Sequence, residues 1–470
     1  MTNYIVFMDA RQNRLCDNNI YYLRNGGFNV KRNKNLGWKK ACAAMMAAAM
    51  TITMLPVNSM AQTSATAVES GKFSNPVIYA DVPDMDIIRV NDTYYMVSTT
   101  MHLSPGCPIM KSKDLVNWEI VNYVYDILGD TDAMNLRNGE SMYGNGQWAA
   151  SLQYHNNKYY VAFNSNTTGH AYIYTTDDIE NGSWTKTELA NFYHDMALFF
   201  DGDTPYIVYG SGEIKYVELS EDLSGEKEGG KRGTLFSAHS GADAGKFDGG
   251  LSFEGTHVMK KDGYYYLSIP EGGVGTGWQT ILRSKNIYGP YEKKVVLEQG
   301  STTINGPHQG AIVDTPDDQW AFFHFQHHHA LGRVVHLQPM HWENDWPVIG
   351  VDFDRNGIGE PVYVCQKPIE SKTIFAPQTD DDFSTPNLSL QWQFNHNPVN
   401  THWSLNERRG WLALKALKAA TLRESRNMLT QKCMGYLSTA TVLLDFSALA
   451  DGQRGGLFCT GSLYNGIGIS

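Results

Sequence analysis

Three acidic residues begin apolar segments in three separate parts of the chain. They are Asp84, Asp195 and Glu254. An acid at the start of a buried strand costs free energy unless it is paired or has a function. Taken alone, Asp195 and Glu254 are equally well interpreted as polar strand ends at the surface, and Asp84, which is close to Asp81 and Asp86, as part of a turn of solvated acids. Because all three stand at equivalent positions of a repeated pattern, we expect them to meet, and converging carboxyl groups can act as general acids and bases.

The elements that would position these acids are short aromatic strands that recur along the chain. Such strands are expected over residues 94–99, 158–165, 205–212, 264–269 and 319–325. Turn sequences such as Lys261-Asp262-Gly263 stand just before them, which is typical of hairpins. A spacing of about 45–65 residues favours a five-bladed β-propeller over a β-sandwich with unrelated hairpins. In a propeller the innermost strands converge on a central channel, where acids at their starts would gather.

The composition excludes two classes of protein. Charged residues make up 19% of the chain and hydrophobic residues 42%, which excludes a largely disordered chain. The formal net charge is -11, and a field of that sign repels phosphate backbones, so we expect no nucleic-acid partner. The content of 44 Gly, 26 Tyr, 19 Phe and 11 Trp indicates an all-β protein with many turns and with flat rings suited to a sugar ligand.

The first 61 residues differ in composition from the rest. They contain eight Lys or Arg residues and two acids. A basic run over residues 31–40 precedes an apolar stretch over residues 41–57, which is shorter than the ~20 residues of a membrane-spanning helix. This pattern predicts a signal peptide with a long basic n-region, cleaved before Gln62, and a periplasmic or extracellular protein with no membrane span in the mature chain. A retained N-terminal anchor is the alternative.

Two domains are expected after this leader. Residues 62–364 would form the propeller, residues 365–380 a polar, proline-bearing linker, and residues 381–470 part of a β-sandwich. Four cysteines follow the leader, namely Cys107, Cys365, Cys433 and Cys459. Their wide spacing has no zinc-binding pattern, so we expect buried thiols, with a Cys433–Cys459 disulfide as the alternative.

Several motifs, in the same order along the chain, resemble those of glycoside hydrolase family 43. The motifs are PDMDIIRV (83–90), HDMALFFD (194–201), FEGTHVMKKDGYYYL (253–267), NGPHQGAIVDTPDDQW (305–320) and ALGRVVHLQPMHWENDWPVI (330–349). Met85 and Asp86 replace a Pro and a Ser of the family pattern, and Thr256 replaces a Pro. The resemblance implies a five-bladed β-propeller followed by a concanavalin-like β-sandwich. The sandwich is usually longer than the region left here, so we expect a truncated copy that is poorly folded or depends on the propeller.

The resemblance also implies an inverting glycosidase, whose two carboxyl groups stand about 6.5–9.5 Å apart to leave room for a water molecule. It makes Asp84 the general base and Glu254 the general acid. Asp195 would be the third acid, which orients Glu254 and adjusts its pKa by charge. Glu254 is expected to have a raised pKa because an apolar residue precedes it. Asp81 and Asp86 are the nearest alternatives to Asp84.

Three further side chains are expected to bind substrate. Arg333 resembles the family's arginine that contacts the sugar, with a surface loop cation as the alternative. Trp148 would form a pocket wall by stacking on the C–H surface of a sugar, with ordinary blade core as the alternative. His102 stands where many relatives carry an aromatic subsite residue, and this departure leaves the pocket shape and the substrate open.

One histidine is a candidate metal ligand. His308 resembles a channel histidine that often lies beside a bound calcium, which implies a structural Ca2+, although the chemistry requires no cofactor. Calcium prefers oxygen ligands, so a buried, hydrogen-bonded histidine is the alternative. The run His327-His328-His329 lacks matching acid or Cys spacing, and GGVGTGW (272–278) lacks the register of a nucleotide-binding loop and a following helix. We expect both to be loops.

The activity that the resemblance implies is release of terminal α-L-arabinofuranosyl units from plant cell-wall polysaccharides or oligosaccharides. Release of β-D-xylosyl units is the alternative, because both sugars lack the hydroxymethyl group of a hexose. Either partner is a pentose-containing saccharide. A non-catalytic carbohydrate-binding propeller is the alternative from another class, although it would be expected to have lost one of the three acids. A retaining enzyme on a related fold is a further alternative.

Overall fold

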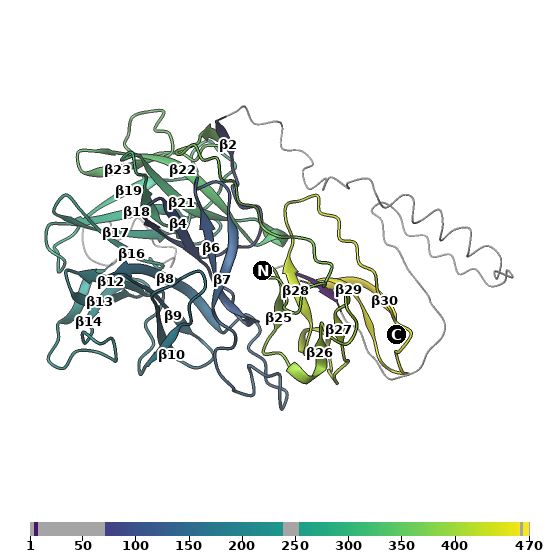
Figure 1. Cartoon of the computed structure of the whole chain (residues 1–470). Helices are drawn as coiled ribbons and strands as arrows, with labels where there is room; N and C mark the ends of the chain where they lie inside the picture. Colours follow the sequence, from purple (N-terminus) through teal and green to yellow (C-terminus); the bar gives the residue numbers. More distant parts are fainter. Residues whose placement is uncertain (1–3, 8–70, 238–252, 461–463, 470) are drawn as a thin grey trace.

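The computed structural model describes residues 4–7, 71–237, 253–460 and 464–469 (Figure 1). Regular structure in this part of the chain is β-strand, apart from three 3-10 helices of three residues each. These helices are His329–Leu331, Asn400–His402 and Leu422–Glu424. Within the same described ranges, no helix is long and apolar enough to cross a membrane. The all-β prediction is confirmed.

Five antiparallel sheets of four strands follow one another along the chain, and we number them as blades I to V. Blade I contains β3 (Asp86–Val90), β4 (Thr93–Val97), β6 (Gly106–Ser112) and β7 (Glu119–Tyr125). Blade II contains β8 (Gln147–His155), β9 (Lys158–Ser165), β10 (His170–Thr176) and β11 (Thr185–Leu189). Blade III contains β12 (Ala197–Asp201), β13 (Thr204–Tyr209), β14 (Glu213–Glu218) and β15 (Arg232–Ser237). Blade IV contains β16 (His257–Lys261), β17 (Tyr264–Glu271), β18 (Trp278–Ser284) and β19 (Glu292–Leu297). Blade V contains β20 (Ile312–Asp314), β21 (Trp320–His327), β22 (Arg333–Glu343) and β23 (Trp346–Ile349).

The blades form the expected five-bladed β-propeller (Figure 1). Apolar side chains fill the space between each pair of neighbouring blades. Met96 of blade I and Phe323 of blade V share one fully buried cluster, which joins the last blade to the first. Burying each such side chain contributes roughly 1.5–3 kcal/mol. The first strand of every blade lines the central channel, so the blade packing fixes the positions of residues at those strand starts.

Two short strands connect the ends of the propeller. Strand β2 (Lys72–Ser74) pairs with β24 (Val364–Gln366), so the segment before blade I is hydrogen-bonded to the segment after blade V. The predicted linker therefore begins inside a strand, because its first two residues pair in β24. The polar residues that follow, 371–380, form no regular structure.

The C-terminal region forms a six-stranded sheet with strands from three parts of the chain. In spatial order the strands are β30 (Tyr464–Ile469), β29 (Gly455–Thr460), β1 (Tyr4–Phe7), β28 (Leu429–Lys432), β25 (Gln393–Asn395) and β5 (Leu103–Ser104). A two-stranded sheet contains β26 (Trp403–Ser404) and β27 (Ala413–Leu414). This is a partial concanavalin-like sandwich, as predicted, and it includes one strand from the propeller.

Most of the predicted leader, including the cleavage point before Gln62, lies outside the described residues. Its residues Tyr4–Phe7 form strand β1 between β28 and β29. The four cysteines after the leader are all free, so no Cys433–Cys459 disulfide forms in this structure. Of the four, only Cys107 is buried.

Candidate active site

The three predicted acids lie at one end of the channel because each of them directly precedes an innermost strand. Asp84 comes two residues before β3, Asp195 two before β12 and Glu254 three before β16. The backbone is left-handed at Asp84 and Asp195, with φ angles of 54° and 46°. Non-glycine residues seldom adopt this conformation, and it is often found where a side chain has a function. The structure thus brings together the residues that the sequence separates by up to 170 positions.

Asp84 is buried and is held by two partners, one on each carboxylate oxygen. The Thr99 hydroxyl donates a hydrogen bond of 2.7 Å to Oδ2. The Arg333 guanidinium forms an ion pair with Oδ1 through Nη1. A buried carboxylate needs such a charge partner, and two contacts from different directions fix its orientation.

Asp195 has a raised pKa. Its side chain is only 10% exposed. Burial is the main reason that its pKa rises to about 6, and the negative charges of Asp84 and Glu254 raise it further. The neighbouring His194 and Arg333 oppose this shift. Asp195 is therefore protonated at a higher pH than an ordinary aspartate.

Glu254 contacts a histidine that the sequence analysis did not identify as part of the site. His194 Nε2 lies 3.5 Å from Glu254 Oε2 and 3.8 Å from Asp195 Oδ2. This contact lowers the pKa of Glu254 more than burial raises it, and it raises the pKa of His194. The expected raised pKa at Glu254 is wrong for the ligand-free chain, because His194 stabilises the carboxylate. The signal was available, since His194 directly precedes Asp195 in the HDMALFFD motif.

The two alternatives to Asp84 have other partners. Asp81 Oδ1 accepts a hydrogen bond of 2.8 Å from the backbone N–H of Arg333. Gly332 has a φ of 79°, and a side chain there would collide with Asp81, so this glycine permits the close approach. Asp86 lies farther along the channel against His257, at 3.0 Å. Of the three aspartates, only Asp84 forms an ion pair with the Arg333 side chain.

Arg333 and Trp148 both lie at this site. The Arg333 guanidinium lies 4.6 Å from the centre of the Phe325 ring in addition to pairing with Asp84, so it is not a surface loop cation. Trp148 is half-buried, and its ring lies 6.5 Å from the ring of His194. Its predicted stacking on a sugar stays a prediction, and this position beside His194 agrees with it.

His102 lies in the contact between the propeller and the C-terminal region. Its buried ring packs against Tyr143 at 4.4 Å and against His396 of the C-terminal region at 5.0 Å. Burial lowers its pKa well below the ordinary value for histidine. The structure gives His102 this packing role, and its predicted contact with substrate stays a prediction.

His308 is buried, and neither of its ring nitrogens has a hydrogen-bond partner among the described residues. Burial, with help from the Arg333 charge, lowers its pKa to about 3, so the ring is neutral and free to accept a ligand. Calcium takes six to eight oxygen ligands. In the described part of the chain, no cluster of three acidic, histidine or cysteine side chains at ligand distance includes His308. The described acidic, histidine and cysteine side chains near His308 therefore do not supply the ligand set of a calcium site. The two unpartnered ring nitrogens of His308 can hydrogen-bond to a water molecule.

Within the histidine run over residues 327–329, His327 ends β21 and His329 begins the 3-10 helix His329–Leu331, so the expected loop is limited to His328. His328 Nδ1 lies 2.7 Å from the Tyr436 hydroxyl of the C-terminal region. The glycine-rich segment over residues 272–278 is likewise a loop between β17 and β18 for most of its length. Neither segment adds a charged group to the acids described above.

This fold, with three acids and a histidine converging at one end of the channel, defines the chain as a β-propeller glycosidase. The sequence model of glycosyl hydrolases family 43 matches residues 73–347, and that of the beta xylosidase C-terminal concanavalin A-like domain matches residues 380–470. The chain therefore belongs to glycoside hydrolase family 43, whose members hydrolyse glycosidic bonds.

Three similar proteins carry names that describe an activity. A putative beta-xylosidase of Xylanibacter ruminicola is 45% identical over 410 residues, covering 85% of this chain and 73% of the relative. A beta-xylosidase of Formosa agariphila is 35% identical over 457 residues, covering 85% and 75%. A non-reducing end alpha-L-arabinofuranosidase of Bacteroides ovatus is 29% identical over 407 residues, covering 82% and 73%.

A solved structure shares the fold. It is a bifunctional GH43-CE protein of Bacteroides eggerthii that is 34% identical to this chain, with a TM-score of 0.69. The match covers 84% of this chain and 58% of that protein. The shared part includes the propeller that holds the acids.

Proposed function

We propose that this glycosidase inverts the anomeric centre and releases terminal β-D-xylosyl units from xylo-oligosaccharides or xylan. The observation that carries the catalytic part is the pairing of Asp84 with Arg333 opposite a Glu254 that contacts His194. The names of the two relatives above 30% identity support the xylosyl specificity. This reverses the order of preference that the sequence analysis gives to arabinofuranosyl and xylosyl units.

Asp84 is the proposed general base. Its carboxylate takes a proton from a water molecule, and the resulting hydroxide oxygen bonds to the anomeric carbon from the face opposite the leaving group. The Arg333 guanidinium pairs with Oδ1 and the Thr99 hydroxyl donates to Oδ2, so the orientation of the carboxylate is fixed. Attack from that face inverts the anomeric configuration.

Glu254 is the proposed general acid, which gives its proton to the glycosidic oxygen as the C–O bond breaks. In the free chain the proton of the His194–Glu254 pair lies mainly on His194, because the pKa of His194 is raised and that of Glu254 is lowered. A bound sugar excludes water from this pair. Loss of solvation disfavours both charged forms and returns the proton to Glu254, which is then ready to donate it.

Release of α-L-arabinofuranosyl units is the second candidate. The name of the Bacteroides ovatus relative favours it, and a terminal pentose without a hydroxymethyl group is common to both candidates. The two differ in ring size and anomeric configuration. Initial rates of the purified chain on aryl β-D-xyloside and aryl α-L-arabinofuranoside decide between them, and we expect the higher kcat/KM on the xyloside.

The decisive experiment replaces Asp84 by Asn and Glu254 by Gln. Each change should lower kcat by about 10²–10⁴-fold, the usual contribution of a general acid or base. Glu292→Gln and Asp92→Asn are matched controls, because the side chains of Glu292 on β19 and of Asp92 in the turn between β3 and β4 are both more than 70% exposed. Wild-type kcat in either active-site variant would refute that residue's role. Binding of xylan with no release of reducing pentose would identify a carbohydrate-binding propeller instead.

The stereochemistry of the product tests the mechanism separately. NMR of the first anomer released from a β-xyloside should show α-xylose, which follows from a single displacement by water. Initial β-xylose would identify a retaining enzyme.

We further propose that residues 1–61 act as an export signal and that the enzyme works in the periplasm or outside the cell. The basic run over residues 31–40 and the apolar stretch after it support this proposal. N-terminal sequencing of the protein from a secreting host should give Gln62 as the first residue. A mature chain that begins well before Ala61 would refute the cleavage.

A further inference from the structure

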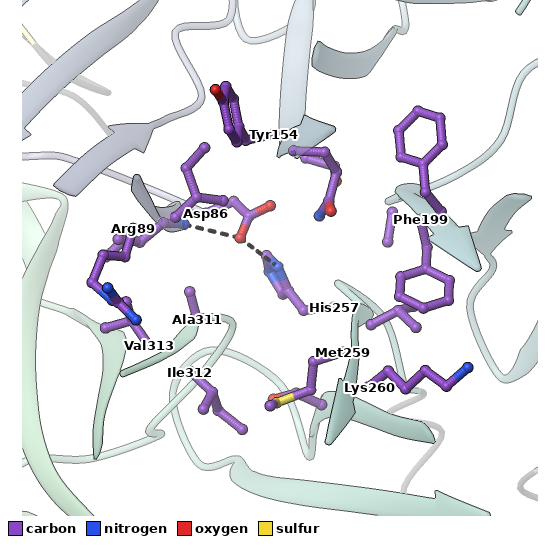
Figure 2. Close-up of a pocket in the computed structure, with 18 of the residues that line it drawn as sticks. Asp86, Arg89, Tyr154, Phe199, His257, Met259, Lys260, Ala311, Ile312 and Val313 are labelled. Carbon is purple, nitrogen blue, oxygen red and sulfur yellow. Dashed lines mark hydrogen bonds and ion pairs between the residues drawn. The ribbon is translucent and has the colours of Figure 1, made fainter. Parts of the chain in front are cut away.

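A cavity of about 510 Å³ (Figure 2) is lined by residues that follow the three acids along the innermost strands of the propeller channel. Its wall is formed by the innermost strands of all five blades, β3, β8, β12, β16 and β20. Most charged groups in the wall are paired locally. Arg89 forms an ion pair with Asp314, and Lys260 lies 2.7 Å from Asp201. Contacts that connect the inner strands across this cavity have to come from the side chains that line it.

One side chain makes such contacts. Asp86 is buried, and its Oδ2 accepts a hydrogen bond of 2.7 Å from the backbone N–H of Leu152 in blade II. Its Oδ1 lies 3.0 Å from His257 Nδ1 in blade IV and also accepts the backbone N–H of Ile87 at 2.9 Å (Figure 2). A single carboxylate therefore connects strands β3, β8 and β16.

Two of these strands directly follow the proposed base and acid. Asp86, the first residue of β3, comes two residues after Asp84, and His257, the first residue of β16, comes three residues after Glu254. A change in the Asp86–His257 distance would therefore change the distance between Asp84 and Glu254. Displacement of a reacting group by about 1 Å can cost on the order of 10²-fold in rate.

His257 also faces the acids electrostatically. Burial opposes its protonation, but the Asp86 carboxylate raises its pKa above the ordinary value, with smaller contributions from Asp195 and Asp84. Because interaction between charges is mutual, a protonated His257 favours the ionised form of Asp195. The other charged groups of the cavity wall, the Arg89–Asp314 and Lys260–Asp201 pairs, have partners of their own.

We propose that Asp86 and His257 are a positioning pair for the catalytic acids, and this proposal rests on the proposed function. Asp86 holds the strands of the base and the acid at their working separation, and the imidazolium of His257 supplies positive charge beneath Asp84 and Asp195.

The first test measures the pH dependence of kcat/KM for His257→Gln on aryl β-D-xyloside. We expect kcat to fall at least tenfold with KM within about threefold, because the change acts on the reacting groups rather than on sugar contacts. The acid limb of the pH profile, where kcat/KM falls as the pH is lowered, should move to higher pH by at least about 0.5 unit. The reason is that loss of a positive charge raises carboxyl pKa values. Lys260→Met removes another cation of β16 and should leave the limb in place. A fall in kcat with no shift of the limb would refute the electrostatic role.

A second test needs no turnover. In histidine-labelled full-length protein, the imidazole signal lost in His257→Gln identifies His257, and its NMR titration should give a pKa above about 6.5. Asp86→Asn, which keeps an oxygen acceptor for Leu152, should lower that pKa by more than one unit and reduce kcat. An unchanged pKa in Asp86→Asn would overturn the pairing. Asp84→Asn, measured in parallel, separates the two proposals, because retained activity there refutes the proposed function and not this pair.

Discussion

The propeller and the C-terminal region are stabilised in different ways. Each pair of neighbouring blades shares a buried apolar cluster of its own, and every blade is a complete four-stranded sheet. Among the described residues of the range 381–470, one small apolar cluster is built on three buried side chains, namely Trp392, Phe394 and Leu429. Their sheet is completed by β5 of the propeller and by β1. The difference indicates that the propeller holds the catalytic groups by its own packing, whereas the C-terminal region depends on contacts with other parts of the chain.

The largest expected contrast concerns one arginine in each region. Arg333→Met leaves the buried Asp84 without its ion-pair partner, and removal of one partner from a buried pair costs about 3–5 kcal/mol. Because Arg333 is partly exposed, we expect a cost below that range, which corresponds to a loss of about 10²-fold in kcat/KM. Arg408→Met removes an exposed pair with Asp445 at 2.8 Å, which is worth about 0–1 kcal/mol. Equal losses in steady-state assays of the two variants would contradict the contrast.

The second contrast is in the sign of a pH effect on stability. The folded pKa of Asp195 is raised to about 6, whereas an unfolded aspartate titrates near 3.9. The folded state therefore retains a proton that the unfolded state loses, so stability is greatest below about pH 4 and falls as pH rises through about 6. Asp195→Asn removes this penalty. The variant should be more stable than wild type at pH 7.5, by on the order of 3 kcal/mol, and similar near pH 4.

Asp445 of the C-terminal region should behave in the opposite way. Hydrogen bonds from Ser447 and the charge of Arg408 lower its folded pKa. Its contribution to stability is therefore present above the unfolded pKa and is lost as pH falls through the lowered folded pKa. Asp445→Asn should be less stable than wild type at pH 7.5 and equal to it in acid. Thermal unfolding of both variants at two pH values checks the signs, and the same sign for both would refute the assignment at Asp195.

The sequence was sufficient to predict the five-bladed fold and the positions of the three acids, because each blade repeats a local pattern of aromatic strand and turn. The groups that it did not reveal depend on contacts between distant segments. Asp86 meets Leu152 across 66 residues, and Lys432 meets Asp81 across 351. The pKa of Glu254 was predicted in the wrong direction for the same reason, since it depends on where the ring of His194 lies. No periodicity or motif spacing records such a distance.

Lys432 tests whether the C-terminal region affects catalysis at all. Its ammonium donates a hydrogen bond to the backbone carbonyl of Asp81, whose side chain in turn accepts the backbone N–H of Arg333. Burial lowers the pKa of this lysine. Lys432→Met should therefore loosen the loop that holds Arg333 and lower kcat by about 3–10-fold, or roughly 1 kcal/mol. Lys415→Met, which removes an exposed pair with Glu407, is the control. Identical kinetics for the two variants would show that the regions are catalytically independent.

The smallest expected effect concerns strand β1. Val6 pairs with Thr430 of β28 on one side and with Phe458 of β29 on the other, so its backbone lies in the middle of the sheet. Val6→Pro removes an N–H donor and introduces a ring that central strands do not tolerate. Hydrogen exchange over residues 429–432 and 455–460 should become faster in this variant, with activity within about twofold of wild type. Val6→Thr keeps the N–H and the branched Cβ, and should exchange like wild type.

Equal exchange in the proline variant would mean that the C-terminal sheet is stable without β1, and its dependence on distant strands would then be limited to β5. Faster exchange has a further consequence if export removes residues 1–61. The edges of β28 and β29 would then both lose a partner, and unpaired strand edges are sites of aggregation. A chain that begins at Gln62 should in that case aggregate at lower concentration than the full chain, while the propeller, whose blades are complete without β1, keeps the same unfolding temperature.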